Sequence, residues 1–271
     1  MLTELAILAG LAVVTGILGG ILSGLLGVGG GIIIVPVLDT ALGWLGVDVA
    51  VRMPVAVATS LATIIPTSIA STRAHLKRGA VDLDLARRWA PAVVAGAIAG
   101  SALASRAHTA LLTGLFGTVA ALVAVKMLLP LENFSLRKEV PRGAASYLIP
   151  ACIGAISCMM GIGGGTLTVP TLTLLNQPVH RAVGTSNLLG LAIGIPGTIS
   201  YLLATPRLGH TPLGTIGLVN LIGFALITPT TVLAAPLGAR IAHGMSRRAL
   251  SATFGMFLAL VAARMLYRTL N

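Results

Sequence analysis

Long apolar stretches alternate with short polar ones along the whole chain, and each half of the chain holds five of them. In the first half they cover residues 5–26, 32–45, 54–74, 89–103 and 110–129. In the second half they cover residues 144–160, 166–175, 182–203, 213–241 and 249–266. Such lengths and polarity suit helices in a hydrocarbon core about 30 Å thick. The pattern predicts an all-α integral membrane protein, built as a polytopic helical bundle.

The second stretch of each half is too short to cross a membrane alone, because an α-helix rises only about 1.5 Å per residue. Each follows a glycine-rich segment, Gly27-Val-Gly-Gly-Gly31 or Gly161-Ile-Gly-Gly-Gly165. Glycine in a helix interior costs about 1 kcal/mol relative to alanine, so the chain is expected to unwind at both segments. Each short stretch is therefore predicted to be a half-helix or a re-entrant piece, and each long helix before it to be discontinuous.

The two glycine segments belong to a duplicated sequence. Residues 20–36 recur at 154–170, with a serine, three consecutive glycines and a Val-Pro pair at matching positions. An Ala-Val-x-Thr-Ser sequence at residues 56–60 recurs at 182–186. We therefore divide the single transmembrane domain, residues 1–271, into a first repeat of 1–130, a linker of 131–143 and a second repeat of 144–271.

Loop charges predict that the second repeat is inverted. The loop after the third stretch holds five Lys and Arg residues in the first half and only Arg207 in the second. After the fourth stretch the bias reverses, with Arg106 alone in the first half and three arginines in the second. Cytoplasmic loops carry an excess of Lys and Arg, so both charge-rich loops and the linker are expected inside. Arg264 and Arg268 near the C-terminus oppose this, and a count of eight spanning helices remains an alternative.

Composition agrees with a membrane protein, since 56% of the residues are hydrophobic and only 9% are charged. The net charge of +11 raises nucleic-acid binding as an alternative. The basic residues, however, form short clusters between apolar stretches and do not alternate with aromatic residues. Such clusters suit loops that face an anionic lipid leaflet. We expect the lipid bilayer and no nucleic acid as a partner.

The glycine breaks are the first candidates for a binding site. An unwound turn followed by a half-helix leaves free N–H groups near the membrane midplane, where they attract an anion. Paired breaks at corresponding positions of two repeats point to the binding site of a transporter. Close helix packing is the alternative role, and residues 20–24 and 96–100 have the spacing for it. The substrate-binding candidates here are Ser23, Gly29, Gly30, Gly31, Ser157, Gly163, Gly164 and Gly165.

Hydroxyl and amide side chains near the start of the third stretch of each half form a second set of candidates. They are Thr59, Ser60, Thr185, Ser186 and Asn187. As a nearly symmetric set beside the glycine breaks, they offer neutral donors to an oxyanion without burying a cation. Serine and threonine in membranes often bond only to their own helix, so a purely structural role is an equal alternative.

Two titratable residues are candidates for coupling or gating. Of the seven acidic residues, only Asp39 lies within an apolar stretch, which makes it a candidate for a proton relay. Because it is close to the end of that stretch, the alternative is that it simply faces water. His75 precedes Lys77 at the predicted cytoplasmic end of the third stretch. It is either a solvated loop residue or a proton-sensing group.

The chain has no Walker sequence, no Gly-x-Ser-x-Gly elbow and no Cys/His cluster with metal-ligand spacing. This excludes an ATP-driven pump within the chain, and no cofactor or metal is expected. We interpret the chain as a transporter and not as an enzyme. The rival interpretation is an intramembrane enzyme or a subunit of a membrane complex without transport of its own.

With these motifs in order, the chain resembles the TauE/SafE family of sulfite and organosulfonate exporters, also called the toluene-sulfonate uptake permease family. The resemblance covers nearly the whole chain and rests on the paired glycine and Ala-Val-x-Thr-Ser motifs, His75-Leu-Lys-Arg-Gly79 and Pro236-Leu-Gly-Ala-Arg240. Ala58 stands where the family usually has a glycine.

The resemblance implies a secondary transporter of small organic or sulfur-containing anions, such as sulfite, sulfonates and sulfoacetate-like molecules. It also implies a multi-pass protein of a bacterial or archaeal inner membrane. We expect alternating access between two inverted repeats, coupled to the proton motive force. The expected partners are a small anionic substrate, the lipid bilayer and a proton, with a homo-oligomer as a further option.

Overall fold

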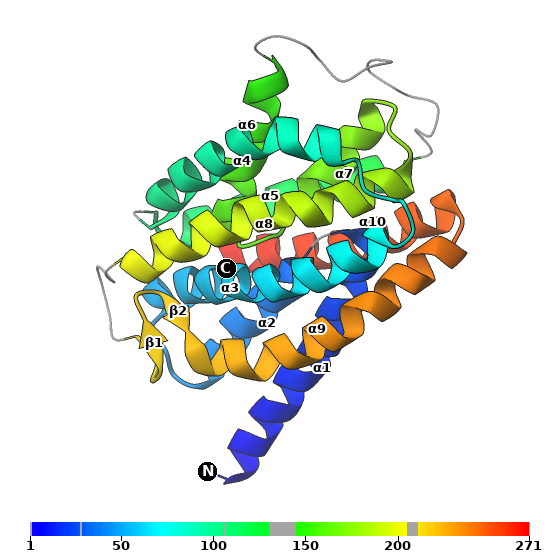
Figure 1. Ribbon diagram of the computed structural model, residues 1–271. Helices are drawn as coiled ribbons and strands as arrows, with labels where there is room; N and C mark the ends of the chain where they lie inside the picture. Colours follow the sequence, from blue (N-terminus) through cyan, green and yellow to red (C-terminus); the bar gives the residue numbers. More distant parts are fainter. Residues whose placement is uncertain (1, 28, 106, 130–144, 205–210, 271) are drawn as a thin grey trace.

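The computed structural model describes residues 2–27, 29–105, 107–129, 145–204 and 211–270. Within them the chain forms ten helices and one two-stranded hairpin (Figure 1). The first half contributes α1 (Leu2–Leu26), α2 (Gly31–Trp44), α3 (Val49–Leu76), α4 (Leu83–Ala104) and α5 (Thr109–Leu128). The second half contributes α6 (Ala145–Met160), α7 (Gly165–Leu174), α8 (Val179–Leu203), β1 (Thr215–Ile216), β2 (Val219–Asn220), α9 (Leu221–Gly244) and α10 (Arg247–Leu270). The all-α class is confirmed, whereas the predicted linker lies outside the described residues.

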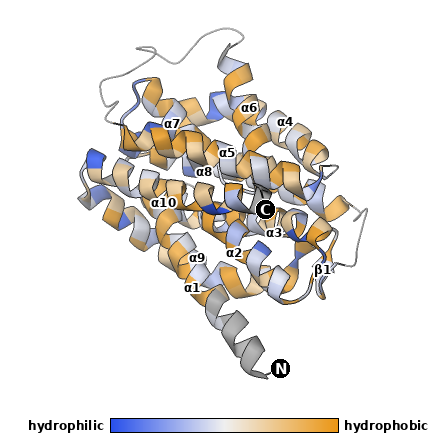
Figure 2. Cartoon of the chain, turned by 180° about the vertical axis from the view of Figure 1, so that it is seen from behind, coloured by the Kyte–Doolittle hydropathy of each residue, from blue (hydrophilic) through white to orange (hydrophobic). Residues whose placement is uncertain are grey.

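The helices have the length and polarity of membrane spans. Among the described residues, α3, α5, α8 and α9 are long and apolar enough to cross a membrane, and shorter apolar helices accompany them. Figure 2 shows hydrophobic residues along most helices, with hydrophilic residues gathered mainly at helix ends and loops. Large apolar side chains such as Leu122, Leu233 and Leu260 are exposed on the outside of the bundle. A surface of this kind is stable in lipid, so the chain is a multi-pass membrane protein.

Both predicted helix breaks are confirmed. The chain leaves α1 at Leu26 and resumes at Gly31, and it leaves α6 at Met160 and resumes at Gly165. The backbone φ angle is +74° at Gly27 and +66° at Gly161, a region that residues with a Cβ atom rarely adopt. The half-helices α2 and α7 that follow are 14 and 10 residues long.

Three predicted helix starts are wrong. The fourth helix begins at Leu83 instead of residue 89, because the Asp82 side chain caps it. Residues 213–220 are not helical, because they contain the β1–β2 hairpin, and α9 begins only at Leu221. The Asn220 side chain caps α9 by accepting a hydrogen bond from the Gly223 N–H. The third helix begins at Val49 instead of residue 54, because the Asp48 side chain caps it. Thr59 and Ser60 therefore lie well inside α3 and not near its start.

The two halves pack reciprocally. The first helix of each half lies along the fourth helix of the other, α1 on α9 and α6 on α4. The third helices, α3 and α8, contact each other, and so do the fifth helices, α5 and α10. A Cβ atom on Gly96 or Gly100 would overlap the α6 backbone at Ala151 or Ala155. The predicted packing role of these glycines is thus confirmed, because the absence of a side chain lets the backbones of α4 and α6 come into contact.

Candidate functional site

The glycine breaks of the two halves lie against each other beside α3 and α8. A Cβ atom on Gly29 would lie 3.2 Å from the Cα of Gly163 and 3.1 Å from the Ile64 side chain on α3. A Cβ atom on Gly31 would overlap the Gly161 carbonyl oxygen. The two unwound segments therefore meet backbone to backbone, which a side chain at either glycine would prevent.

Ser60 and Ser186 tie each break to the opposite half. The Ser60 hydroxyl donates to the Gly161 carbonyl oxygen at 2.7 Å. The Ser186 hydroxyl donates to Val183 of its own helix at 2.8 Å and lies 3.3 Å from the Gly27 carbonyl oxygen. A hydroxyl has a single proton to donate, so Ser60 commits it to the second break, whereas Ser186 commits it mainly to its own helix and holds the first break only weakly.

Thr59 and Thr185 make a second reciprocal pair of ties. The Thr59 oxygen accepts a hydrogen bond from the Asn220 N–H, and the Thr185 oxygen accepts one from the Asp82 N–H, both at 2.9 Å. Asn220 and Asp82 are the residues that cap α9 and α4. Each threonine thus fixes the start of the fourth helix of the other half.

Two cations reach the half-helices from the fifth helices. The Lys126 ammonium on α5 donates to the Pro170 carbonyl oxygen at 3.0 Å and to the Thr173 hydroxyl at 2.6 Å, both on α7. The Arg264 guanidinium on α10 donates to the Thr40 hydroxyl on α2 at 2.6 Å. Positive charge is favourable near helix C-termini, where both contacts lie. Sequence analysis missed this pairing, although both cations stand late in the fifth stretch of their repeats.

Ser23 and Ser157 keep uncommitted hydroxyls. They occupy matching positions one turn before the two breaks and are buried. Neither hydroxyl has a hydrogen-bond partner among the described residues. A buried hydroxyl without a partner is rare in folded proteins.

Asp39 and His75 are both buried, which overturns the reading of either as a water-facing residue. Asp39 lies on α2 with 4% of its surface exposed, and His75 lies on α3 with 1% exposed. The His75 Nε2 atom is 2.9 Å from the Gly24 carbonyl oxygen on α1. Both residues are buried because other helices pack over them, although each lies near the end of an apolar stretch.

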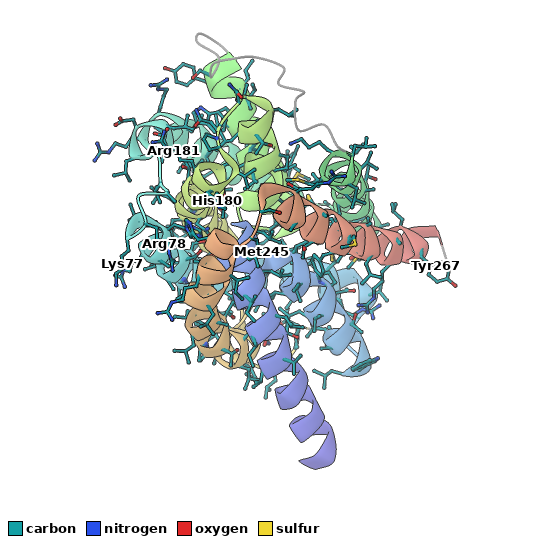
Figure 3. The ribbon with its side chains drawn as sticks, turned by 90° about the vertical axis from the view of Figure 1, so that its right-hand side faces the viewer. Lys77, Arg78, His180, Arg181, Met245 and Tyr267 are labelled. Carbon is teal, nitrogen blue, oxygen red and sulfur yellow. The ribbon has the colours of Figure 1, made fainter. Side chains whose placement is uncertain are left out.

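His75 belongs to a group of three histidines. Its ring lies 5.3 Å from that of His243 on α9, which stacks on His180 of α8 at 5.3 Å. Figure 3 shows Lys77, Arg78, His180 and Arg181 on the same side of the molecule, at the end of α3 and the start of α8. Sequence analysis did not single out His180 or His243, because the three rings come from distant stretches.

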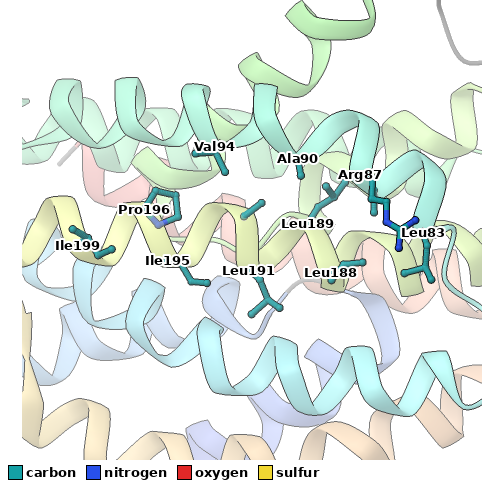
Figure 4. A pocket seen from close by; sticks show the side chains of 12 residues that line it. Leu83, Arg87, Ala90, Val94, Leu188, Leu189, Leu191, Ile195, Pro196 and Ile199 are labelled. Carbon is teal, nitrogen blue, oxygen red and sulfur yellow. The ribbon is translucent and has the colours of Figure 1, made fainter.

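A groove lies between α4 and α8, and its lining includes no residue of the glycine breaks (Figure 4). Its volume is about 490 Å³, and its lining is apolar apart from Arg87. Such a lining has no donors for an anion along most of its length. No group of three or more metal-ligating side chains occurs in the part of the chain that the structure describes.

Comparison with known proteins gives one family and several relatives. Residues 12–265 match the family described as "Sulfite exporter TauE/SafE". A "Probable membrane transporter protein" of Haemophilus influenzae is 31% identical, over 94% of this chain and 97% of its own length. A probable membrane transporter protein of Methanocaldococcus jannaschii is 28% identical, over 86% of this chain and 84% of its own length. One of Bacillus subtilis is 25% identical, over 94% of this chain and 96% of its own length. No solved structure matches the chain.

Proposed function

Because the chain belongs to the sulfite exporter TauE/SafE family, we propose that it is a secondary transporter of small organic or sulfur-containing anions. Sulfite, sulfonates and sulfoacetate-like molecules are the solutes we expect. The observation that carries this proposal is the meeting of the two glycine breaks inside the bundle. Unwound backbone at the interface of two repeats is where transporters of this construction bind their solutes.

The solute binds at the breaks through neutral donors. The N–H groups of Gly29 to Gly31 and Gly163 to Gly165, together with the Ser23 and Ser157 hydroxyls, supply hydrogen bonds to its oxygens. Ser60, Ser186, Thr59 and Thr185 hold these donors in place through their ties across the halves. Lys126 and Arg264 contact the half-helices farther along, so the anion meets neutral groups that bind it reversibly.

Transport proceeds by alternating access between two inverted repeats. The reciprocal packing of α1 on α9 and α6 on α4 supports this arrangement, because each half covers the other in the same way. The protein lies in a bacterial or archaeal inner membrane, with the loops after α3 and α9 in the cytoplasm. Asp39 or His75 couples solute movement to the proton motive force.

Solute flux into proteoliposomes tests the proposed function. The purified protein should carry sulfite or a short sulfonate with saturable kinetics, above the rate of protein-free vesicles. Gly164→Leu should insert normally yet carry no flux, because even a Cβ atom there lies only 3.1 Å from the Ser186 carbonyl oxygen. Absence of saturable flux for every solute of this class would contradict the proposal and favour an enzyme or a complex subunit.

A further inference from the structure

The duplicated centre is not chemically symmetric. The half-helix α7 carries Thr166 and Thr168, whereas the matching positions of α2 are Ile32 and Ile34. All four side chains are buried. At these two positions the second half-helix therefore carries hydroxyl groups where the first carries hydrocarbon.

The same asymmetry extends to the third helices. Asn187 on α8 corresponds to Leu61 on α3, and Ser68 on α3 corresponds to Gly194 on α8. In this register Thr185 corresponds to Thr59. The Thr-Ser pair is present in both third helices. Asn187 and Ser68, by contrast, each correspond to a nonpolar residue of the other half.

Two of these polar groups lie beside Gly164 at the second break. A Cβ atom on Gly164 would lie 3.3 Å from the Thr168 hydroxyl oxygen. A Cβ atom on Gly190 of α8 would lie 2.8 Å from the Ser68 hydroxyl oxygen and 3.9 Å from the Gly164 nitrogen. Asn187 precedes Gly190 by three residues, so both lie on the same face of α8. Ser68 and Thr168 thus lie close to the Gly164 backbone, at a place that is closed in this state, because even one added carbon atom at Gly190 would crowd the Ser68 oxygen.

These groups have hydrogen-bonding capacity that the protein does not use. Ser68, Thr168 and Asn187 have no exposed surface, and the two hydroxyls and the Asn187 Oδ1 atom have no partner among the described residues. Neighbouring Thr67 and Thr171 instead donate to carbonyl oxygens of their own helices, both at 2.7 Å. The N–H of Gly164, just before α7, also has no acceptor among the described atoms. Unpartnered buried groups aimed at the N-terminus of a ten-residue helix indicate a ligand.

We propose that the contacts which select the solute come from the second break, with Gly164 N–H, Ser68 and Thr168 donating to its oxygens and Asn187 Oδ1 accepting a hydrogen bond from it. This inference rests on the proposed function and names the site and the solute chemistry within it. The solute is a small monoanion with at least two acceptor oxygens and one donor group. Hydrogensulfite has this set, and so does a short sulfonate that carries a hydroxyl group.

The matched pair of isethionate and ethanesulfonate tests the solute chemistry, because the two differ only in one hydroxyl group. Binding to the detergent-purified protein is measured by the shift of its thermal unfolding midpoint with anion concentration. The wild type should bind isethionate about tenfold more tightly than ethanesulfonate. Asn187→Leu, which copies Leu61 of the other half, should abolish this preference. Equal binding of both anions by the wild type would overturn the acceptor role of Asn187.

Four further variants test the donors. Thr168→Val and Ser68→Ala should weaken isethionate binding by about ten- to a hundredfold, the effect of losing a hydrogen bond to an anion. Thr168→Ser keeps the hydroxyl and should bind within about threefold of the wild type. Thr171→Val is the matched control on α7, because it removes a hydroxyl already bonded to its own helix, and its affinity should stay unchanged.

The thermal stability of the variants distinguishes a side chain that binds the solute from one that only supports the fold. Removing an unpartnered buried hydroxyl should leave the midpoint of ligand-free Thr168→Val equal to that of the wild type or higher. A lower midpoint with unchanged affinity would overturn the binding role. If Thr168→Val and Ser68→Ala bind and carry isethionate like the wild type, this site is wrong and the proposed function stands. If the wild type neither binds nor carries sulfite, isethionate or ethanesulfonate, both proposals fail.

Discussion

Replacing Ser60 by alanine would remove the hydrogen bond that joins α3 to the break of the second half. The Gly161 carbonyl oxygen would lose a donor that now lies at 2.7 Å, in a place that stays buried. An acceptor left without a partner in the interior costs about 1–3 kcal/mol. Each kcal/mol lowers the midpoint of a chain of this size by about 2–4 °C, so Ser60→Ala should lower it by roughly 2–12 °C.

Ser186→Ala is the internal comparison, because its geometry predicts a smaller effect. The shorter contact of Ser186 is with Val183 of its own helix, and the contact across the halves to the Gly27 carbonyl oxygen is 3.3 Å long. A bond of that length is weak, so the loss should stay below about 1 kcal/mol. Thr67→Val, whose hydroxyl serves only its own helix, should lower the midpoint no more than Ser186→Ala does.

Thermal unfolding of the three detergent-purified variants, followed by tryptophan fluorescence, measures these differences. The expected order of midpoints places Ser60→Ala lowest and the other two close to the wild type. Equal losses for Ser60→Ala and Ser186→Ala would refute the reasoning from bond length. A Ser60→Ala protein with an unchanged midpoint and reduced anion affinity would show that Ser60 is a ligand and not a tie.

In a Cys-free variant, cysteines placed at Lys77 and Ser246 should both be labelled by an impermeant thiol reagent from the cytoplasmic side, and labelling from opposite sides would contradict the inverted repeat. Lys126→Met should lower the free energy of unfolding by about 1.5–3 kcal/mol, because the hydrogen bonds to α7 are lost, and the unfolding midpoint should fall. Lys77 is exposed, so Lys77→Met should leave the midpoint unchanged. Asp39→Asn or His75→Ala should make solute flux independent of a pH gradient while counterflow exchange survives. Unchanged pH dependence in both variants would place the proton on the solute.

The helix breaks could be predicted because their cause is local. Three consecutive glycines destabilise a helix wherever they stand, and the structure interrupts α1 and α6 at these glycines. The hairpin before α9 was missed, because an apolar stretch that starts at Leu213 does not reveal whether its first residues are helical. Gly214 and Gly217, which adopt positive φ angles there, were the available signal.

The ties between the halves could not be predicted from one sequence. Ser60 and Gly161 are 101 residues apart, and hydrophobic pattern carries no information about such contacts. The unequal chemistry of the two breaks, by contrast, is visible in the sequence, where Thr168 matches Ile34. Most of the substrate-binding candidates were chosen among residues that are the same in both repeats. Ser68 and Thr168 were missed because the other repeat has a different residue at each matching position.

The reciprocal ties also set an order of events during synthesis. Thr59 receives its hydrogen bond from Asn220, which the ribosome adds 161 residues later. At about 5–20 residues per second, that interval lasts roughly 8–30 s. Throughout it the first half stands in the membrane without α9, which packs on both α1 and α3. The nascent protein therefore depends on shielding at the insertion machinery until α9 arrives, and a ribosome stalled before residue 220 would leave a product open to quality-control proteases.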